Sequence, residues 1–333
     1  MSTLGSNVLT LADWAKRLDP DGKVPVIVEL LSQTNEILMD MLWKEGNLAT
    51  GNRTTVRTGL PTVYWRLLNQ GVQPSKSTTA QIDESVGFLE AWSEVDKELA
   101  ELENNVNDFR LSEATAFLEA MSQEMASTLF YGNSSLDPEE FNGLSVRYAD
   151  LSAQNARNIV DAGGQSTDNS SIWLIVWGEN GVFGIFPKGS KAGVDHEDLG
   201  LVTVETTAGI AGSRMRAYQD RFTFKAGVAL KDWRQAVRIC NIDISNLVAE
   251  SSAANLTKLL SKAVHRIQNL KAGKAAIYCN RTIIEYLDIQ RQNIVNTGGG
   301  ITYQNVDGEV IPYFRGIPIR LCDALLETES RVT

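Results

Sequence analysis

The 333 residues are 43% hydrophobic and 22% charged, values typical of a globular chain that folds into one or two domains. No apolar run is long enough for a membrane-spanning helix, and the first residues lack the basic and apolar regions of a signal peptide. The net charge of −10 argues against a protein whose whole surface binds nucleic acid, although it leaves room for a local basic face.

The start of the chain predicts an arm followed by a helix. Residues 1–22 are small, polar and weakly patterned, which indicates an N-terminal arm. In residues 23–46, apolar side chains recur at helical spacing between about Val26 and Trp43, and Gly46 is a suitable end. We therefore predict that a helix in this segment leads into the body of the protein.

Residues 47–80 predict an extended β arm. Two runs rich in β-branched and aromatic residues, NRTTVRT and TVYWRLL, are separated by GLP, and a return strand follows within AQIDESVGFLEAWS. The arm is light on large apolar side chains for its length and cannot bury a core alone, so we expect it to lie on another chain. The candidate intersubunit residues are Arg53, Arg57, Tyr64, Trp65 and Arg66.

The longest helical pattern lies within residues 81–170, after a short acidic helix predicted for SEVDKELAELEN. Apolar residues between Asn107 and Gly132 recur at spacings of three and four, with N-cap types at the start and a glycine stop. We predict a helix over 108–131 that lies against a sheet as a spine. Its expected core residues are Phe117, Leu118, Met121, Met125 and Leu129.

Residues 171–244 form the densest β region. Five strands are predicted, within SIWLIVWG, GVFGIFP, LVTVET, MRAYQDRFTFKAGVAL and WRQAVRICNI, with GENGVFG as a hairpin turn between the first two. Trp173, Trp177 and Trp233 lie inside apolar runs, which favours core packing over stacking on sugars.

The remaining residues mix helices and short strands. In 245–311, an amphipathic helix with Leu256 to Leu270 on one face precedes the strand GKAAIYCN, the helix RTIIEYLDIQRQN and a glycine-rich loop. Two short closing strands are predicted on either side of Arg315–Gly316, and residues 312–333 end the chain.

No catalytic constellation is recognisable. His196 lies in the loop motif DHED, which is a solvated acidic turn far more often than a cation site, and His265 is a packing or surface residue of a helix. The Gly298–Gly300 run lacks the Lys-Ser/Thr of a phosphate loop. We predict no enzyme activity, no cofactor and no metal. Buried thiols rather than disulfides are expected of Cys240, Cys279 and Cys322.

The order of these parts resembles the major capsid proteins of tailed bacteriophages, which have the HK97-like fold, and is most like those of short-tailed phages. In that family the loop after the long helix carries a glycine turn, a proline and Gly-Leu, here Gly132, Pro138 and Gly143-Leu144. The closing segment carries an aromatic residue, a glycine and Ile-Pro, here Phe314, Gly316 and Ile317-Pro318. The strings TVRTGLPTVYWRLLNQG, PKGSKAG and DWRQAVRICNI are also similar to family sequences.

The resemblance implies an α+β, HK97-like capsid fold. Residues 47–80 would be the E-loop over a neighbouring subunit, 81–170 a peripheral domain with the spine helix, 245–311 an axial-type domain, and 312–333 closing strands of the peripheral domain. The block 171–244 is longer than the strand set of the family, so it is interpreted as an insertion or as strands threaded in a different order. Lys76, the one lysine of the arm, has no recognisable partner, and no covalent cross-link is carried over.

The function implied is self-assembly into the icosahedral head shell that encloses a double-stranded DNA genome. The implied partners are further copies in hexamers and pentamers, a scaffold, a cement or decoration protein, a portal protein, and packaged DNA held without sequence-specific contact. The resemblance places the protein in the virion capsid, assembled in the host bacterial cytoplasm, with no membrane contact. Two alternatives stay open at this point, a bacterial nanocompartment (encapsulin-like) shell and a β-rich carbohydrate-binding protein.

Overall fold

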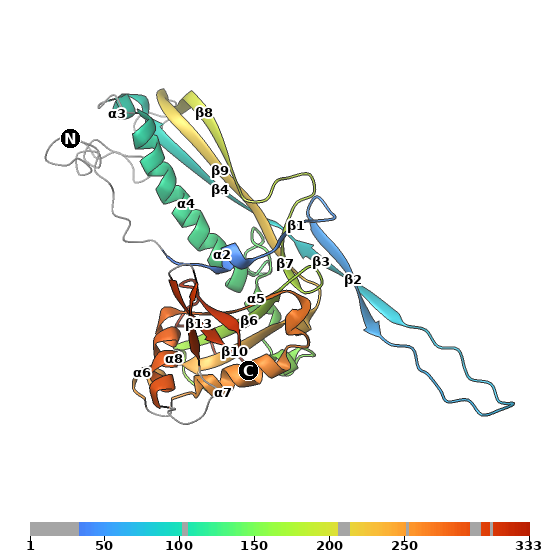
Figure 1. Ribbon diagram of the computed structural model, residues 1–333. Coiled ribbons are helices and arrows are strands. Elements are labelled where there is room, and N and C mark those ends of the chain that lie inside the picture. Colours follow the sequence, from blue (N-terminus) through green and yellow to red (C-terminus); the bar gives the residue numbers. More distant parts are fainter. Residues whose placement is uncertain (1–32, 102–105, 206–213, 251–252, 294–300, 307–308) are drawn as a thin grey trace. The chain divides into compact units, whose positions relative to one another are not determined.

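The computed structural model describes residues 33–101, 106–205, 214–250, 253–293, 301–306 and 309–333 (Figure 1). The predicted N-terminal arm, the first part of the helix predicted in 23–46, and Gly298–Gly300 lie outside the described residues. The chain divides into two compact units. Unit 1 consists of Met1–Asn35, Phe88–Ser127 and Gly193–Lys225, and unit 2 of Glu36–Gly87, Thr128–Ala192 and Ala226–Thr333.

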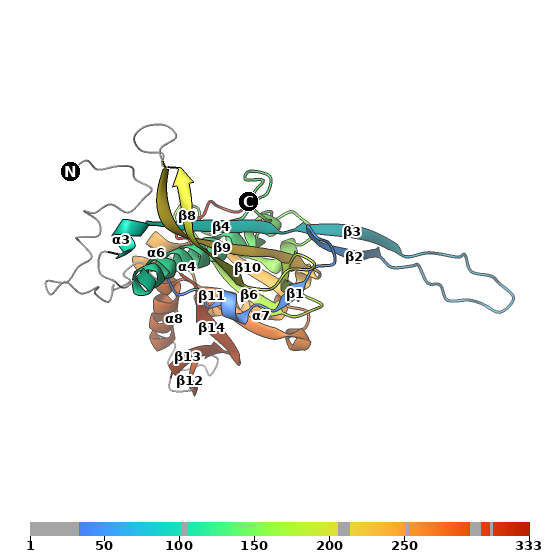
Figure 2. The same ribbon diagram turned by 90° about the horizontal axis from the view of Figure 1, so that it is seen from above.

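Unit 1 combines strands with most of the long helix. Its elements are β4 (Gly87–Asp96), α3 (Lys97–Glu101), α4 (Val106–Tyr131), β8 (Val194–Glu205) and β9 (Arg214–Leu230). β8 and β9 pair antiparallel from Val194 opposite Phe224 to Glu205 opposite Arg214. β4 is the next neighbour of β9 in the sheet (Figure 2). Phe117 of α4 stacks on Phe222 of β9 with ring centroids 6.2 Å apart, so the helix packs on this strand.

Unit 2 is centred on β6, whose nine residues are all buried. β6 pairs antiparallel with β10 on one side and with β11 on the other, and β11 pairs parallel with β14. β5 extends the sheet beyond β10, and β13 and β12 extend it beyond β14. The strands are β5 (Ile159–Asp161), β6 (Asn169–Trp177), β10 (Ala236–Asp243), β11 (Lys274–Cys279), β12 (Thr302–Val306), β13 (Glu309–Phe314) and β14 (Ile317–Leu321).

Helices of unit 2 close the core over this sheet. α7 buries Leu256, Leu259, Leu260 and Ala263, which join Ile172, Leu174 and Val237 of β6 and β10 in one apolar cluster. Asn255 accepts a hydrogen bond from the N–H of Lys258 and so caps the start of α7. The helices are α2 (Ile37–Asp40), α5 (Leu144–Arg147), α6 (Ile244–Val248), α7 (Leu256–Arg266) and α8 (Arg281–Asn293), with short 3-10 turns η1 (Ala156–Asn158), η2 (Trp233–Gln235) and η3 (Leu270–Ala272).

A second group of strands in unit 2 carries the arm. β7 (Val182–Phe186) pairs parallel with β1 (Trp43–Glu45) and antiparallel with the last residues of β9. β2 (Gly51–Gly59) and β3 (Thr78–Ser85) form a separate antiparallel pair, which is the long hairpin in Figures 1 and 2. Within the described residues, no helix has the length and apolar character needed to cross a bilayer.

Most predicted elements are found. All five strands of 171–244 are present, as are the long helix, α7, β11, α8 and the closing strands on either side of Arg315–Gly316. The closing strands pair with β11 and β12, so they lie in the same sheet as the segment assigned to the axial-type domain. The predicted acidic helix is reduced to the five residues of α3.

Three predictions of local structure are wrong. Among the described residues of 26–43 only α2 is helical, because Leu42 and Trp43 bond and pair with β7 instead. The run TVYWRLL forms no strand, since β3 pairs with β2 alone. GENGVFG is not a hairpin turn: β6 and β7 share one parallel pair, Trp177 with Val182, and β7 takes its antiparallel partner from β9.

Candidate assembly surfaces

The half of the arm that adjoins the body is a regular hairpin. Its register runs from Gly51 opposite Ser85 to Gly59 opposite Thr78. Arg53 donates to both carboxylate oxygens of Asp83, with distances of 2.6 and 2.7 Å, and this hydrogen bond lowers the pKa of Asp83. Both side chains are about half exposed, so solvent screens the pair and it contributes little to stability. Arg57 follows Arg53 on the same face of β2 and is exposed.

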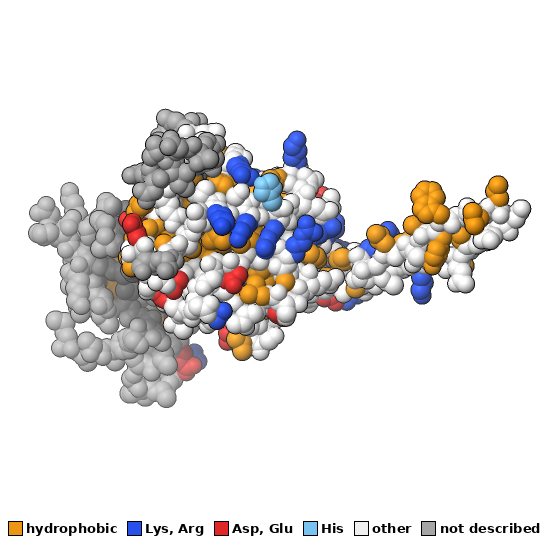
Figure 3. Space-filling model, turned by 90° about the horizontal axis from the view of Figure 1, so that it is seen from below, with side chains coloured by type: hydrophobic (Ala, Val, Ile, Leu, Met, Phe, Trp, Pro, Cys, Tyr) orange, Lys and Arg blue, Asp and Glu red, His pale blue; other side chains and the backbone are white. Residues whose placement is uncertain are grey.

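The tip of the arm, residues 60–77, presents apolar side chains to solvent. The sequence-based expectation of few large apolar groups is wrong here. Ser75 donates from Oγ to the carbonyl oxygen of Thr62 at 2.6 Å, so the two sides of the tip are linked even without strand pairing. Tyr64 and Trp65 are 58% and 104% exposed, and Arg66 is exposed beside them. The other exposed apolar residues are Leu60, Val63, Leu67, Leu68 and Val72, and Figure 3 shows orange side chains along the tip.

The root of the arm is held by a buried ion pair that the sequence did not reveal. Glu84 near the end of β3 is buried, and its two carboxylate oxygens accept from Nη1 and Nη2 of Arg147 at 2.5 Å each. Arg147 also donates to the carbonyl oxygens of Asn142 and Val228 at 3.1 and 3.3 Å. Two such parallel charged bonds fix an orientation as well as a position. The arm therefore leaves unit 2 in a defined direction.

Close backbone contacts complete the root. A Cβ atom on Gly51 would lie 1.9 Å from the carbonyl oxygen of Glu84, so only glycine fits where β2 leaves the body. Val86, just after β3, lies in an apolar cluster with Phe183, Ile185 and Ala229. These contacts join the hairpin to β7 and to the end of β9 within one unit.

The predicted spine residues differ in burial. Met121, Met125 and Leu129 are 3% exposed or less, and Phe117 is partly buried against Phe222. Leu118 is 40% exposed, so its prediction as a core residue is wrong for the single chain. Leu118 lies four residues after Ala114, so the spacing rule places both on one face of α4. That rule alone does not show whether such a face is buried or exposed to solvent.

A buried network in unit 2 joins distant segments. Arg238 donates to Glu329 at 2.9 Å and lies over the ring of Trp173 at 5.4 Å. Glu329 also accepts from the hydroxyls of Tyr131 and Ser171. Burial is the main cause that raises the pKa of Tyr131, with the adjacent Glu329 carboxylate as the second cause, so the phenol stays a donor. No local sequence pattern signals this network, because its members are far apart along the chain.

The histidines do not form a chemical site. His196 lies in β8 rather than in a loop, and its Nε2 is 2.9 Å from Asp220, which also accepts from Arg110 at 2.8 Å. His265 is an exposed residue of α7, as one of the predicted alternatives had it. Among the described residues, no group of His, Cys, Asp or Glu side chains could hold a metal ion.

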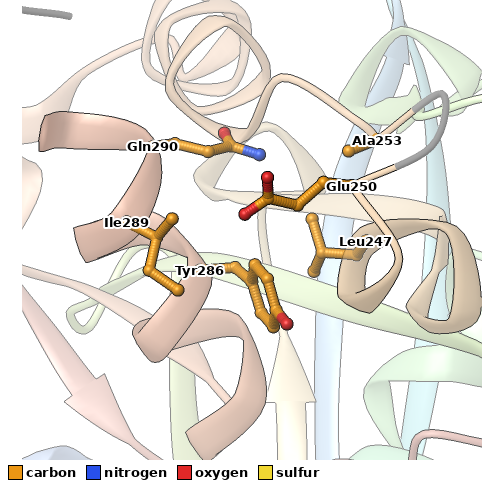
Figure 4. Close-up of a pocket in the computed structure, with 6 residues that line it drawn as sticks. All are labelled: Leu247, Glu250, Ala253, Tyr286, Ile289 and Gln290. Atoms are coloured by element: carbon orange, nitrogen blue, oxygen red, sulfur yellow. The ribbon is translucent and has the colours of Figure 1, made fainter. Parts of the chain in front are cut away.

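One small pocket of about 210 Å³ lies between the end of α6 and α8. Figure 4 shows Glu250, Tyr286 and Gln290 around it. The Gln290 amide is already used, because it accepts from the N–H of Leu256 at 2.9 Å and donates to the carbonyl oxygen of Ala254 at 2.8 Å. The Tyr286 hydroxyl is also used, because it donates to the carbonyl oxygen of Val248 at 3.3 Å, so the lining leaves one carboxylate, that of Glu250. The apolar lining residues are Leu247, Ala253 and Ile289.

Of the three tryptophans predicted to be core residues, Trp173 and Trp177 are buried and Trp233 is only partly buried. Trp173 and Trp177 are 0% and 2% exposed, and Trp177 donates to the hydroxyl of Tyr278 at 2.8 Å. Buried rings cannot stack on a sugar, so the carbohydrate-binding alternative loses its two main residues. The surfaces left for function are the arm and the outer faces of the two units.

Comparison with known protein families shows which family the chain belongs to. The family model for the major capsid protein GP7 matches residues 19–333. The chain belongs to this family of major capsid proteins. No curated protein sequence matches the chain.

Solved structures agree with that assignment. A protein in the structure of bacteriophage Epsilon15 is 34% identical to this capsid protein, with a TM-score of 0.78 and 100% of both chains covered. The capsid protein therefore has the α+β, HK97-like fold of a tailed-phage shell. Two distant matches are a capsid protein of a native GTA particle and the SrpI encapsulin of Synechococcus elongatus. They are 10% and 11% identical, cover 71% and 70% of this chain and 99% and 96% of theirs, and have TM-scores of 0.46 and 0.42. The encapsulin match does not favour the nanocompartment alternative.

Proposed function

We propose that the capsid protein assembles into hexamers and pentamers through its arm, with the apolar tip seated on a neighbouring copy. The observation that carries this proposal is the exposure of seven large apolar side chains at the end of a hairpin whose root is fixed. Burying them against another chain removes their contact with water, at about 25 cal/mol per Å² of apolar surface. In a closed shell every copy would give one such contact and receive one, so a modest energy is multiplied.

Individual roles follow from position on the arm. Tyr64 and Trp65 supply the rigid apolar anchors that dominate many protein interfaces, and Arg66 and Arg57 supply charge at their rim. Arg53 keeps the hairpin in register through Asp83. Residues 47–80 thus act as the E-loop.

The wider assembly is also part of the proposal. The shell would form in the host bacterial cytoplasm with a scaffold, a portal and a cement protein, and would enclose double-stranded DNA without reading its sequence. The protein would act as a structural component without catalysis, because the described residues bring together no acid, base and nucleophile set. The domain scheme of arm, peripheral and axial-type parts stays a prediction within this proposal.

The test removes the apolar character of the tip and keeps its length. In the triple variant Trp65→Ser, Leu67→Ser and Leu68→Ser, we expect an unchanged cooperative unfolding transition and no closed particles by electron microscopy. Leu136→Ser is the matched control, because Leu136 is 76% exposed in the same unit but lies off the arm. Parental shells from the triple variant would refute the role of the tip.

A further inference from the structure

One segment of this acidic chain carries no acidic residue at all. Residues 251–284 contain six of the 31 Lys and Arg residues and none of the 41 Asp and Glu residues. The segment includes α7 and β11, and both belong to unit 2. A run of this length without a carboxylate is unexpected in a chain with net charge −10.

Two of these lysines lie on the outer face of α7. Lys258, Lys262 and His265 are exposed and follow one another at spacings of four and three, so they share one side of the helix. The opposite side is buried in the core of unit 2. Figure 3 looks onto the side of the protein that carries α7 and shows a row of Lys and Arg side chains across it.

Residues from other elements extend this cationic face, which we define as Arg157, Lys258, Lys262, His265, Arg266 and Arg315. η1 carries Arg157 and packs beside α7. Burial lowers the pKa of Arg266, and the nearby positive charge of Arg157 adds to that effect. Nη1 of Arg315 lies 3.1 Å from Nε2 of His265, so this ring nitrogen accepts the bond from the guanidinium. The cations Arg157 and Arg266 thus lie near each other, and Arg315 lies beside His265 of α7.

No neighbouring carboxylate neutralises these cations in the part of the chain that the structure describes. No Asp or Glu oxygen there lies within 4.0 Å of an Arg157, Lys258, Lys262, Arg266 or Arg315 nitrogen in a described ion pair. Asp232, which follows β9, pairs with Arg234 at 2.9 Å.

Stability of the helix does not explain the pattern. A cation is favourable at the C-terminal end of a helix, as Arg266 is, but unfavourable in the first turn, where Lys258 lies. A solvent-exposed cluster of like charges also repels itself unless a counterion or ligand is present. The cationic face is therefore better explained by an anionic partner than by folding.

The composition of the face separates two kinds of partner. Protein interfaces carry large apolar anchors at their centre. Among the described residues 253–284, no large hydrophobic side chain is exposed, and the exposed polar groups are Lys, Arg, His, Gln and Asn. Such groups suit phosphate oxygens, which need charge and hydrogen-bond donors but no apolar pocket.

We propose that the cationic face of α7 contacts the phosphates of packaged duplex DNA, independently of base sequence. This inference rests on the proposed function, in which the shell encloses DNA, and identifies the surface of the subunit that faces it. The small number of cations against a net charge of −10 makes the contact weak per subunit, with a salt dependence that grows with each phosphate contacted. Weak contacts repeated over a shell hold DNA without fixing it.

The test compares two charge reversals of equal size. The double variant Lys258→Glu and Lys262→Glu removes the centre of the face, and the control Lys188→Glu and Lys191→Glu changes two exposed lysines elsewhere in unit 2. Binding of the unassembled full-length protein to a fluorescent DNA duplex is measured over a salt series. We expect the first variant to bind at least ~10-fold more weakly, with a salt slope smaller by about 1 for each lost contact. The control should bind within about twofold of the parent, as scattered surface charges do.

Particle formation is scored separately by electron microscopy. Weak DNA binding together with normal shells supports the inference. Equal losses of DNA binding in both variants would show an effect of net charge alone and overturn it, as would a parent protein that does not bind DNA. Normal DNA binding with failed assembly would make the face an interface between copies, again overturning it. If the Glu variant does not fold, Lys258→Gln with Lys262→Gln decides by the same criteria. Failure of the triple tip variant to change assembly would instead refute the proposed function and leave the DNA measurement readable.

Discussion

Two tryptophans of this capsid protein show how differently the arm and the sheet of unit 2 use apolar residues. Trp65 at the arm tip is 104% exposed, whereas Trp173 on β6 is fully buried. Trp173 lies 6.1 Å from the ring of Phe130 and 5.7 Å from that of Tyr148. The sheet buries its apolar side chains within the chain, whereas those of the arm tip are exposed to solvent. Apolar content therefore predicts burial only when the number of neighbouring elements is known.

The largest effect should come from removing the buried ring. Trp173→Ala leaves a cavity among aromatic neighbours and uncovers Arg238, so we expect a loss of about 3–5 kcal/mol in the free energy of unfolding. Trp65→Ala should change it by less than about 0.5 kcal/mol, because an exposed side chain leaves no cavity. Denaturant unfolding of the unassembled protein measures both. Similar losses in the two variants would remove the contrast between arm and sheet.

The second prediction compares two ion pairs of the same arm. Arg147→Ala leaves the buried Glu84 carboxylate uncompensated, and we expect a loss of about 3 kcal/mol in stability and faster amide exchange along β2 and β3. Arg53→Ala breaks an exposed, solvent-screened pair and should leave stability and amide exchange near those of the parent. Hydrogen exchange with mass spectrometry resolves the two strands. Slow exchange in Arg147→Ala would mean that the root does not depend on this pair.

A third, smaller effect should appear at alkaline pH. Burial raises the pKa of Cys240 and of Cys322 from the ordinary 9.0 to about 12. The folded state then holds protons that the unfolded state releases, so these thiols contribute stability below about pH 9 that is lost as pH rises towards about 12. The denaturation midpoint should fall across this window, and less steeply in Cys240→Ala. An equal slope in the variant would contradict the assignment.

The smallest effect is expected at Leu118. Because its side chain is 40% exposed, Leu118→Asp should change the unfolding free energy of the unassembled protein by less than about 1 kcal/mol. Met121 is one turn further along α4 and 3% exposed. Met121→Asp buries a charge, so it should prevent folding and no cooperative melting transition should be seen. Thermal melts followed by circular dichroism compare the two. A failure of Leu118→Asp to fold would place that side chain in the core after all.

Local patterns along the chain were sufficient for most of the fold. The five strands of 171–244 and the helices α4, α7 and α8 follow from β-branched runs and from apolar spacing, since each buries its own stripe. The predictions failed where a distant partner overrode the local pattern. The local pattern predicts Trp43 to be helical, but this residue pairs with Gly184 of β7. Local rules do not capture a pairing between residues so far apart in the sequence.

The candidate surfaces were only partly visible in the sequence. The composition of residues 47–80 predicts the arm, with Trp65 among its candidate residues. It does not predict how many large apolar side chains the tip exposes. The root was missed, because Glu84 and Arg147 are 63 residues apart and each alone reads as an ordinary surface charge. The net charge does not exclude a local basic face, but it does not identify one either. Arg157 and Arg315 are distant from α7 in sequence and lie beside it only in the folded structure.

The separation of Glu84 from Arg147 also has a consequence for synthesis on the ribosome. The hairpin leaves the exit tunnel 63 residues before the arginine that anchors it, a delay of about 3–13 s at ~5–20 residues per second. The third support of the root, the carbonyl of Val228, is made a further 81 residues later. Throughout that time Trp65 and its apolar neighbours belong to a nascent chain in which the contacts that orient the arm have not yet formed. Polysomes make many such chains side by side, so premature contact between arms of neighbouring nascent chains is the hazard that this order of synthesis creates.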